Sequence, residues 1–216
     1  MHSKKNKPAG TEKIMKIGNG KAIVEKHKLK GSKEEVESFF ANLFFSIACK
    51  DKNFPFPLSK SLKINDQNDL DFSLEVEGEN TLLELMEIAP LENTRGGHSN
   101  APDSYSLEER CEFIQQKIAQ KSNKYRGIAT DIFLLLYSTD WKFSLTPFDF
   151  RTLSKIFHRE SYYYRAIFYI SWFPGITEND GKVHILFPEN ISPYFSQPEV
   201  VGDQGMKLDL DDFTIE

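Results

Sequence analysis

The chain has 216 residues, of which 39% are apolar, 13% aromatic and 27% charged, with a formal net charge of −5 at pH 7. This length fits one domain, with or without appendages. No apolar run reaches the roughly 18 residues of a membrane span, and the amino end runs into polar residues instead of the apolar stretch of a signal peptide. We therefore expect a soluble, cytoplasmic protein with no membrane partner.

The cysteines and the short motifs exclude several further classes of protein. Cys49 and Cys111 lie far apart and belong to no C-x-x-C pair, which argues against a disulfide framework and against cysteine-ligated zinc. Both thiols are expected to be buried core residues. The chain also lacks a P-loop, a dinucleotide glycine fingerprint and a G-x-S-x-G elbow. Nucleotide-hydrolysing, redox and serine-hydrolase functions therefore have no support.

Charge is distributed very unevenly along the chain. Residues 1–33 hold ten lysines against two glutamates, a sum of +8, whereas residues 199–216 hold six acids against one lysine, a sum of −5. A basic arm of this density attracts a polyanion such as nucleic acid, with steeply salt-dependent binding. The simpler alternative is a solvated tail, or one folded back on the acidic end.

The amino-terminal part is polar, and only residues 21–24 have the character of a short edge strand. Ser32 and Glu35 then have the spacing of a capping box, and apolar residues follow at helical period. We predict a helix from this point to about Cys49.

The middle of the chain predicts a β-hairpin. Residues 69–77 alternate between apolar and polar, as in a half-buried strand, and residues 81–89 form a more apolar strand. We place the tight turn between them at residues 78–80. The second strand carries acids that need an explanation.

The carboxy-terminal half predicts two more helices among further strands. Ser106 and Glu109 form another capping box before a helical pattern, and Pro147 stands at the first position of a later helix. The expected elements are a helix over 107–125, a buried strand over 131–138, a helix from 147, and strands over 162–173 and 183–187. This order predicts an α/β (α+β) fold with one mixed central sheet flanked by helices.

The domain organisation follows from these patterns. We expect a basic, partly flexible arm over residues 1–32, a single domain over 33–198 and an acidic tail over 199–216.

One lysine of the second predicted helix lies beside its apolar stripe. On a helical wheel the stripe is narrow, and Lys121 falls at its edge, one turn before Tyr125. A lysine held against a sheet requires a carboxylate partner, so an acid on the facing strands is expected. The alternative is that the aliphatic stem packs while the ammonium reaches solvent. The stripe consists of Leu107, Cys111, Ile114, Ile118 and Tyr125.

The hairpin supplies the candidate carboxylates. Asp71 lies in its first strand, and Glu84 and Glu87 lie in its second. Since side chains alternate across a strand, Glu84 shares a face with Met86 and Glu87 points the opposite way, so only one of them should join Asp71. Two acids with a nearby lysine suit a divalent-metal site, in which hard oxygen ligands hold Mg²⁺ and the lysine stabilises developing negative charge. The alternative is a solvated sheet edge or a structural ion pair.

These residues resemble the restriction-endonuclease-like (PD-(D/E)xK) nuclease superfamily. The resemblance spans roughly residues 33 to 140 and combines Asp71 in a strand, the run Leu83-Glu84-Leu85-Met86-Glu87-Ile88, and Lys121-x-x-x-Tyr125 at the end of a helix. It implies a restriction-endonuclease-like core and an Asp and a Glu-x-Lys that bind Mg²⁺ or Mn²⁺ and cleave phosphodiester bonds. Met86 stands where the motif lysine belongs, and Ala89 does if Glu87 is the match. The superfamily includes members whose lysine comes from the following helix, which is the position of Lys121.

The resemblance gives the leading functional hypothesis. Asp71 and Glu84, or Glu87, are the predicted metal ligands, Lys121 stabilises the transition state, and Tyr125 positions the scissile strand. The expected partner is nucleic acid, and homo-oligomerisation is left open. The competing hypothesis keeps the fold without the chemistry, as a catalytically inactive binding or assembly module.

Two further patterns are weaker. Arg95 and His98, in a glycine-rich loop, suit a phosphate clamp and a proton carrier, although a solvent loop is the simpler interpretation. The aromatic run from Tyr162 to Trp172 suits either base stacking or packing.

Overall fold

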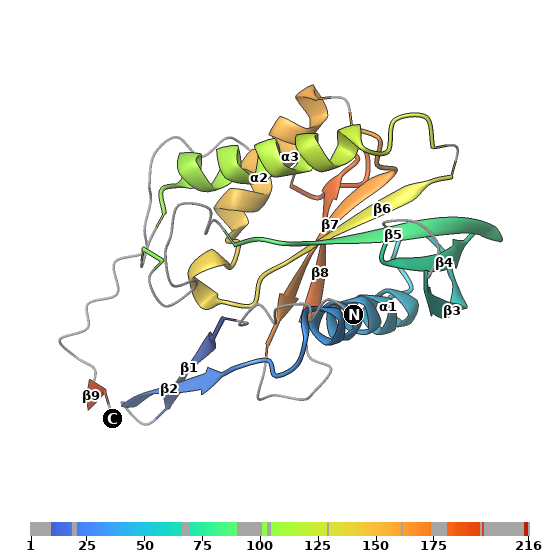
Figure 1. The fold of residues 1–216 in the computed structure, drawn as a ribbon. Helices are drawn as coiled ribbons and strands as arrows, with labels where there is room; N and C mark the ends of the chain where they lie inside the picture. The colour runs from blue at the N-terminus through green and yellow to red at the C-terminus, as the bar shows by residue number, and fades with distance from the viewer. Residues whose placement is uncertain are drawn as a thin grey trace, which may run out of the picture.

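The structure is a computed structural model that describes residues 10–18, 21–65, 70–89, 101–102, 105–128, 130–160, 162–173, 181–194, 196 and 214–215. The fold is α+β, with a twisted, mixed six-stranded sheet between helices, as predicted (Figure 1). Within the described residues, no helix combines the length and apolar character needed to cross a membrane.

The central sheet has the strand order β3-β4-β5-β6-β7-β8. The β5–β6 and β6–β7 pairs are parallel and the other three pairs are antiparallel. Helix α1 precedes β3, α2 connects β5 to β6, and α3 connects β6 to β7. The bounds are α1 Lys33–Lys50, β3 Leu58–Ile64, β4 Phe72–Val76, β5 Glu79–Glu87, α2 Leu107–Asn123, β6 Ile132–Tyr137, α3 Pro147–Arg159, β7 Ala166–Trp172 and β8 Gly181–Phe187.

The predicted capping boxes set the starts of the first two helices. Ser32 Oγ accepts the Glu35 backbone N–H at 3.3 Å, and the Ser32 N–H donates to Glu35 Oε2 at 2.6 Å. Ser106 and Glu109 form the same pair at 3.1 and 2.9 Å. Each box satisfies N–H groups that the first turn of a helix leaves unpaired.

The hairpin turn lies one residue earlier than predicted. Val76 pairs with Glu79, so the turn consists of Glu77 and Gly78 and not of residues 78–80. Both turn residues have positive φ, 54° for Glu77 and 87° for Gly78. This is the two-residue geometry that follows the right-handed twist of a hairpin, and Gly78 adopts it without strain from a Cβ atom.

The sheet separates two hydrophobic layers. Helix α1 covers one face, where it packs on Leu83 and Leu85 of β5 and on alternate residues of β6 and β7. Helices α2 and α3 cover the other face, which includes Met86 (Figure 1). Cys111 is buried in this second layer, whereas Cys49 is exposed at the end of α1, so the prediction of two buried thiols is wrong for Cys49.

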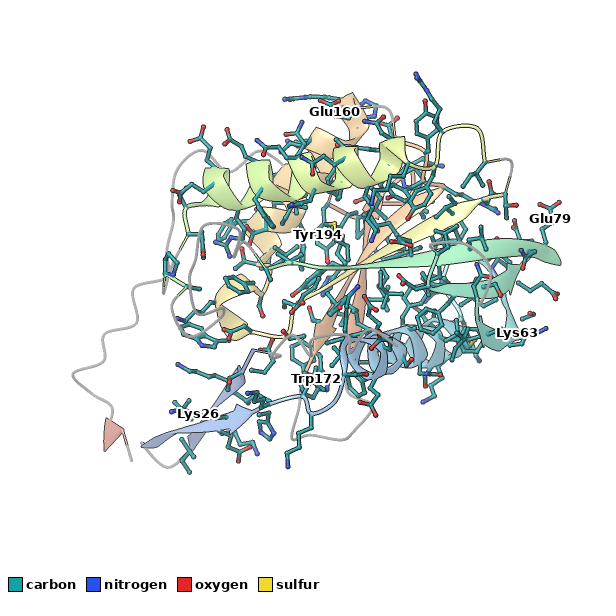
Figure 2. All side chains as sticks on the ribbon, in the orientation of Figure 1. Lys26, Lys63, Glu79, Glu160, Trp172 and Tyr194 are labelled. Carbon is teal, nitrogen blue, oxygen red and sulfur yellow. The ribbon has the colours of Figure 1, made fainter. Side chains whose placement is uncertain are left out.

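The basic amino-terminal region contains more structure than the short strand predicted at residues 21–24. Strand β1 (Glu12–Gly18) pairs antiparallel with β2 (Lys21–His27), and β9 (Thr214–Ile215) joins β2 in parallel. This second sheet stands apart from the central one, and Lys26 lies on it (Figures 1 and 2). The rest of the acidic tail, residues 199–213 and 216, lies outside the described residues.

The β1–β2 hairpin is fixed to the domain at its base. The N–H groups of Gly10 and Thr11 donate to Thr139 Oγ1 at 3.1 Å and to Asp140 Oδ2 at 3.0 Å. The Lys13 ammonium lies 4.2 Å from the ring centroid of Trp141. The hairpin therefore leaves the domain at the loop that follows β6.

Candidate functional site

Lys121 reaches from α2 to the middle of the central sheet. Its ammonium forms an ion pair with Glu84 Oε1 on β5, and it donates a hydrogen bond to the backbone carbonyl of Leu85 at 3.0 Å. The Lys121 side chain keeps 26% of its surface exposed, whereas Glu84 keeps 2%. The structure thus pairs this lysine with a strand carboxylate and does not point it into solvent.

Asp71 is held at the same residue of β5. It directly precedes β4, and its Oδ2 atom accepts a hydrogen bond from the Leu85 backbone N–H at 2.8 Å. Asp71 and Lys121 therefore bind the two backbone polar groups of one residue. The carboxylates of Asp71 and Glu84 and the ammonium of Lys121 converge around Leu85.

The sheet geometry explains this convergence. The β4–β5 ladder ends at the pair Phe72–Leu83, while β5 continues to Glu87. Beyond Leu83 the backbone N–H and C=O groups of β5 that point toward β4 need other partners. Side chains from the start of β4 and from α2 provide them at Leu85.

Glu84 has the most perturbed environment of the cluster. Burial raises the pKa of its carboxyl and the nearby Asp71 adds to the increase, while Lys121 and the Tyr125 hydroxyl lower it, and the net result is a shift from 4.5 to about 7. Its Oε2 atom is buried and accepts no hydrogen bond from the described residues. A carboxyl group with these properties exchanges its proton near neutral pH and has an acceptor position available.

Two tyrosines line the same region. Tyr125 follows α2 and is 5% exposed, and Tyr164 precedes β7 and is 4% exposed. Their rings make a T-shaped contact at 6.1 Å between centroids. Burial and the neighbouring Tyr125 and Glu84 raise the pKa of Tyr164. The Tyr164 hydroxyl is buried without a hydrogen-bond partner among the described residues, so it is a second polar atom available near Glu84.

A third acid, not identified from the sequence, comes from α1. Glu37 is 7% exposed, and its carboxylate forms an ion pair with Lys33 at 3.0 Å. Burial raises the pKa of Glu37, and the charge of Asp71 adds to the increase while Lys33 and Lys121 oppose it. Glu37 is thus electrically coupled to the Asp71 cluster. The sequence contains one indication that Glu37 faces the core, because it lies four and seven residues before Ala41 and Phe44 on the same helix face, and both of these are buried.

Glu87, the alternative metal ligand, lies elsewhere. Its carboxylate accepts a hydrogen bond from Thr139 Oγ1 at 2.5 Å, in the loop that also binds Gly10. Met86 packs in the core beneath α2. The alternation of side chains along β5 therefore assigns Glu84, and not Glu87, to the cluster that contains Asp71 and Lys121.

The remaining predictions concern a glycine-rich loop and the aromatic run from Tyr162 to Trp172, of which Tyr164 lies near Glu84. Arg95 and His98 lie outside the described residues. The aromatic residues of β7 mainly pack in the core: Phe168 and Tyr169 are buried, and the Tyr169 hydroxyl donates to or accepts from Ser138 Oγ at 3.1 Å.

The hairpin end of the central sheet carries a hollow that no residue of the cluster lines. A hollow of about 200 Å³ lies over the hairpin strands and is lined by Ser61, Lys63, Ser73, Leu74, Glu75, Gly78 and Asn80. By strand alternation Asn80 shares its face with Glu84. The same end of the sheet carries Lys63 and Glu79 in Figure 2.

The cluster contains oxygen atoms of the kind that bind a small divalent cation. Among the described residues, no group of three or more histidine, cysteine or acidic side chains is arranged to hold a metal ion. Mg²⁺ does not require such a cage, since it binds through one or two carboxylates and keeps water or substrate oxygens as its other ligands. Asp71, Glu84 with its unpartnered Oε2, and the Leu85 carbonyl offer hard oxygen donors of this kind.

Comparison with known proteins gives no relative: no family model matches the chain, and neither a curated protein nor a solved structure is significantly similar to it.

Proposed function

We propose that the protein is a metal-dependent nuclease with a restriction-endonuclease-like core, which hydrolyses phosphodiester bonds in nucleic acid. The observation that carries the proposal is the convergence of Asp71, Glu84 and Lys121 on Leu85. The order of elements supports it, since a helix, three antiparallel strands, a crossover helix and a parallel strand follow each other from α1 to β6. The hollow over the hairpin strands, on the sheet face that Glu84 shares, offers room for a substrate strand.

The residues would divide the chemistry among them. Asp71 and Glu84 would hold Mg²⁺ or Mn²⁺, which when bound supplies Lewis-acid activation and neutralises phosphate charge. Glu84, whose Oε2 atom has no hydrogen-bond partner among the described residues, can accept a proton from an attacking water. Lys121 can stabilise the negative charge that develops on the phosphate oxygens. The Tyr125 hydroxyl, beside Glu84, can position the substrate backbone.

The decisive experiment is a cleavage assay on the full chain. Purified protein is incubated with DNA and with RNA in the presence of Mg²⁺, Mn²⁺ or a chelator. We expect metal-dependent cleavage, and we expect Asp71→Asn to reduce its rate by about 100-fold or more, the scale of losing one preorganised group. Glu112→Gln is the control, because Glu112 is an exposed acid on α2 that does not line the hollow.

Two results would contradict the proposal in different ways. Full activity in Asp71→Asn would refute the site. Absence of cleavage of either nucleic acid with either metal would refute the nuclease function and favour the catalytically inactive binding or assembly module.

A further inference from the structure

The ammonium of Lys121 lies where a metal ion would find its oxygen ligands. Its Nζ atom contacts Glu84 Oε1 and the Leu85 carbonyl oxygen, and Asp71 is fixed to the same residue through the Leu85 N–H. The remaining Glu84 oxygen is buried and has no hydrogen-bond partner among the described residues. A cation therefore already contacts Glu84, one of the two carboxylates that the proposed function assigns to a metal.

The local charges favour either the Lys121 ammonium or a metal ion at this position, but not both. Glu37, Asp71 and Glu84 are electrically coupled with the ammonium groups of Lys33 and Lys121. With all five groups ionised, the cluster carries one net negative charge. A divalent ion added to the intact cluster would reverse that charge in a largely buried place, whereas loss of the Lys121 charge would leave two negative charges, which match the ion.

The distances between the ligand atoms also argue against a metal ion and the Lys121 ammonium being bound at the same time. Mg²⁺ binds oxygen at about 2.0–2.1 Å with near-octahedral geometry. An ion that took the Leu85 carbonyl and Glu84 Oε1 as ligands would lie against an ammonium hydrogen-bonded to that carbonyl at 3.0 Å. Two like-charged centres so close repel each other strongly in a poorly solvated site.

We propose that Lys121 is a tethered cation that competes with a divalent metal ion for Glu84 and the Leu85 carbonyl. Metal binding then requires Lys121 to leave these oxygens, and its exposed fraction of 26% shows that the side chain has access to solvent. This inference rests on the proposed function in one respect, since it takes the divalent metal from that proposal. It adds that metal affinity in the free protein is set by Lys121.

The test measures Mn²⁺ binding to the full chain, from the loss of the free-ion electron paramagnetic resonance signal. We expect Lys121→Met to bind Mn²⁺ at least 10-fold more tightly than the wild type. Lys124→Met, which changes an exposed lysine at the end of the same helix, should leave the affinity unchanged. Adding Asp71→Asn to Lys121→Met should remove the gain. If Lys121→Met does not fold, as judged by circular dichroism, Lys121→Gln removes the charge and keeps a hydrogen-bond donor for Leu85.

The outcomes separate the two proposals. Equal or weaker Mn²⁺ binding by the folded Lys121 variant would overturn the competition, even if the wild type is a nuclease. Tighter binding by that variant, together with no cleavage by the wild type, would support the competition and refute the nuclease function.

Discussion

Lys121 and Glu84 form an ion pair across the interface between α2 and β5, in which the Glu84 side chain is 2% exposed and the Lys121 side chain is 26% exposed. This ion pair links the apolar face of α2 to the acidic residues of the β4–β5 hairpin. Glu84 also contributes to how the stability of the protein responds to pH.

Stability should fall between mildly acidic and mildly alkaline pH because of Glu84. Its carboxyl binds a proton more tightly in the folded state, where the pKa is about 7, than at the ordinary value of 4.5. This group therefore favours folding at low pH, and the benefit is lost as pH rises through 7. Glu84→Gln should abolish this dependence. As pH rises from about 4.5 to 7, the free energy of unfolding of the wild type should fall by about 3 kcal/mol relative to that of the variant. Urea denaturation at a series of pH values measures this difference. The same pH dependence of unfolding free energy in wild type and Glu84→Gln would contradict the prediction.

His184 should produce the opposite dependence at lower pH. Burial, assisted by the charge of Lys182, lowers the pKa of this histidine from 6.5 to about 4. Its ring nitrogens bond Ser171 Oγ at 3.0 Å and the Tyr194 hydroxyl at 2.6 Å. Because the unfolded chain takes up the proton first, stability is lost as pH falls from about 6.5 to 4, by about 3 kcal/mol. His184→Gln should remove this acid-side slope in urea denaturation, and an unchanged slope would assign it to other groups.

Gly78 should tolerate asparagine better than alanine. Its φ is 87°, and a Cβ atom there would meet no atom within 4 Å, so the penalty of substitution is conformational and not steric. Gly78→Ala should lower the free energy of unfolding by about 1–2 kcal/mol. Gly78→Asn should lower it by less, since asparagine adopts this backbone conformation more readily. Equal losses of unfolding free energy in the two variants, measured by chemical denaturation, would show that the positive φ at residue 78 does not decide the cost of substitution.

The basic hairpin should control the salt dependence of nucleic-acid binding. Lys26, Lys28 and Lys30 are exposed on β2 and the segment that follows it. Changing all three to glutamine should reduce the slope of log affinity against log salt by about 2 to 3 units. Substitution is a sharper test than deletion of the arm, because deletion also removes the contacts of Gly10 and Thr11 with the domain. The same changes at Lys50, Lys52 and Lys124 provide the control, and an equal effect there would refute a specific role for the hairpin.

The features that follow from local periodicity were predictable from the sequence. The helical wheel placed Lys121 beside the sheet, and strand alternation separated Glu84 from Glu87. The turn at Glu77 and Gly78 was misplaced by one residue, because positive φ at a glutamate leaves no clear mark in composition. Glu37 required the three-dimensional structure, since its link to Asp71 depends on how α1 crosses the sheet. Pairing of β9 with β2 joins the two ends of the chain, and no local pattern specifies it.

The hydrogen bonds at Leu85 also occupy main-chain groups of β5 beyond the end of its ladder with β4. A strand that extends beyond the end of its neighbour leaves main-chain donors and acceptors that another extended chain can pair with. Here one carboxylate and one ammonium occupy those groups. Removing both Asp71 and Lys121 would leave the Leu85 N–H and C=O without these partners, so the residues proposed for catalysis also satisfy main-chain groups that could otherwise pair with another extended chain.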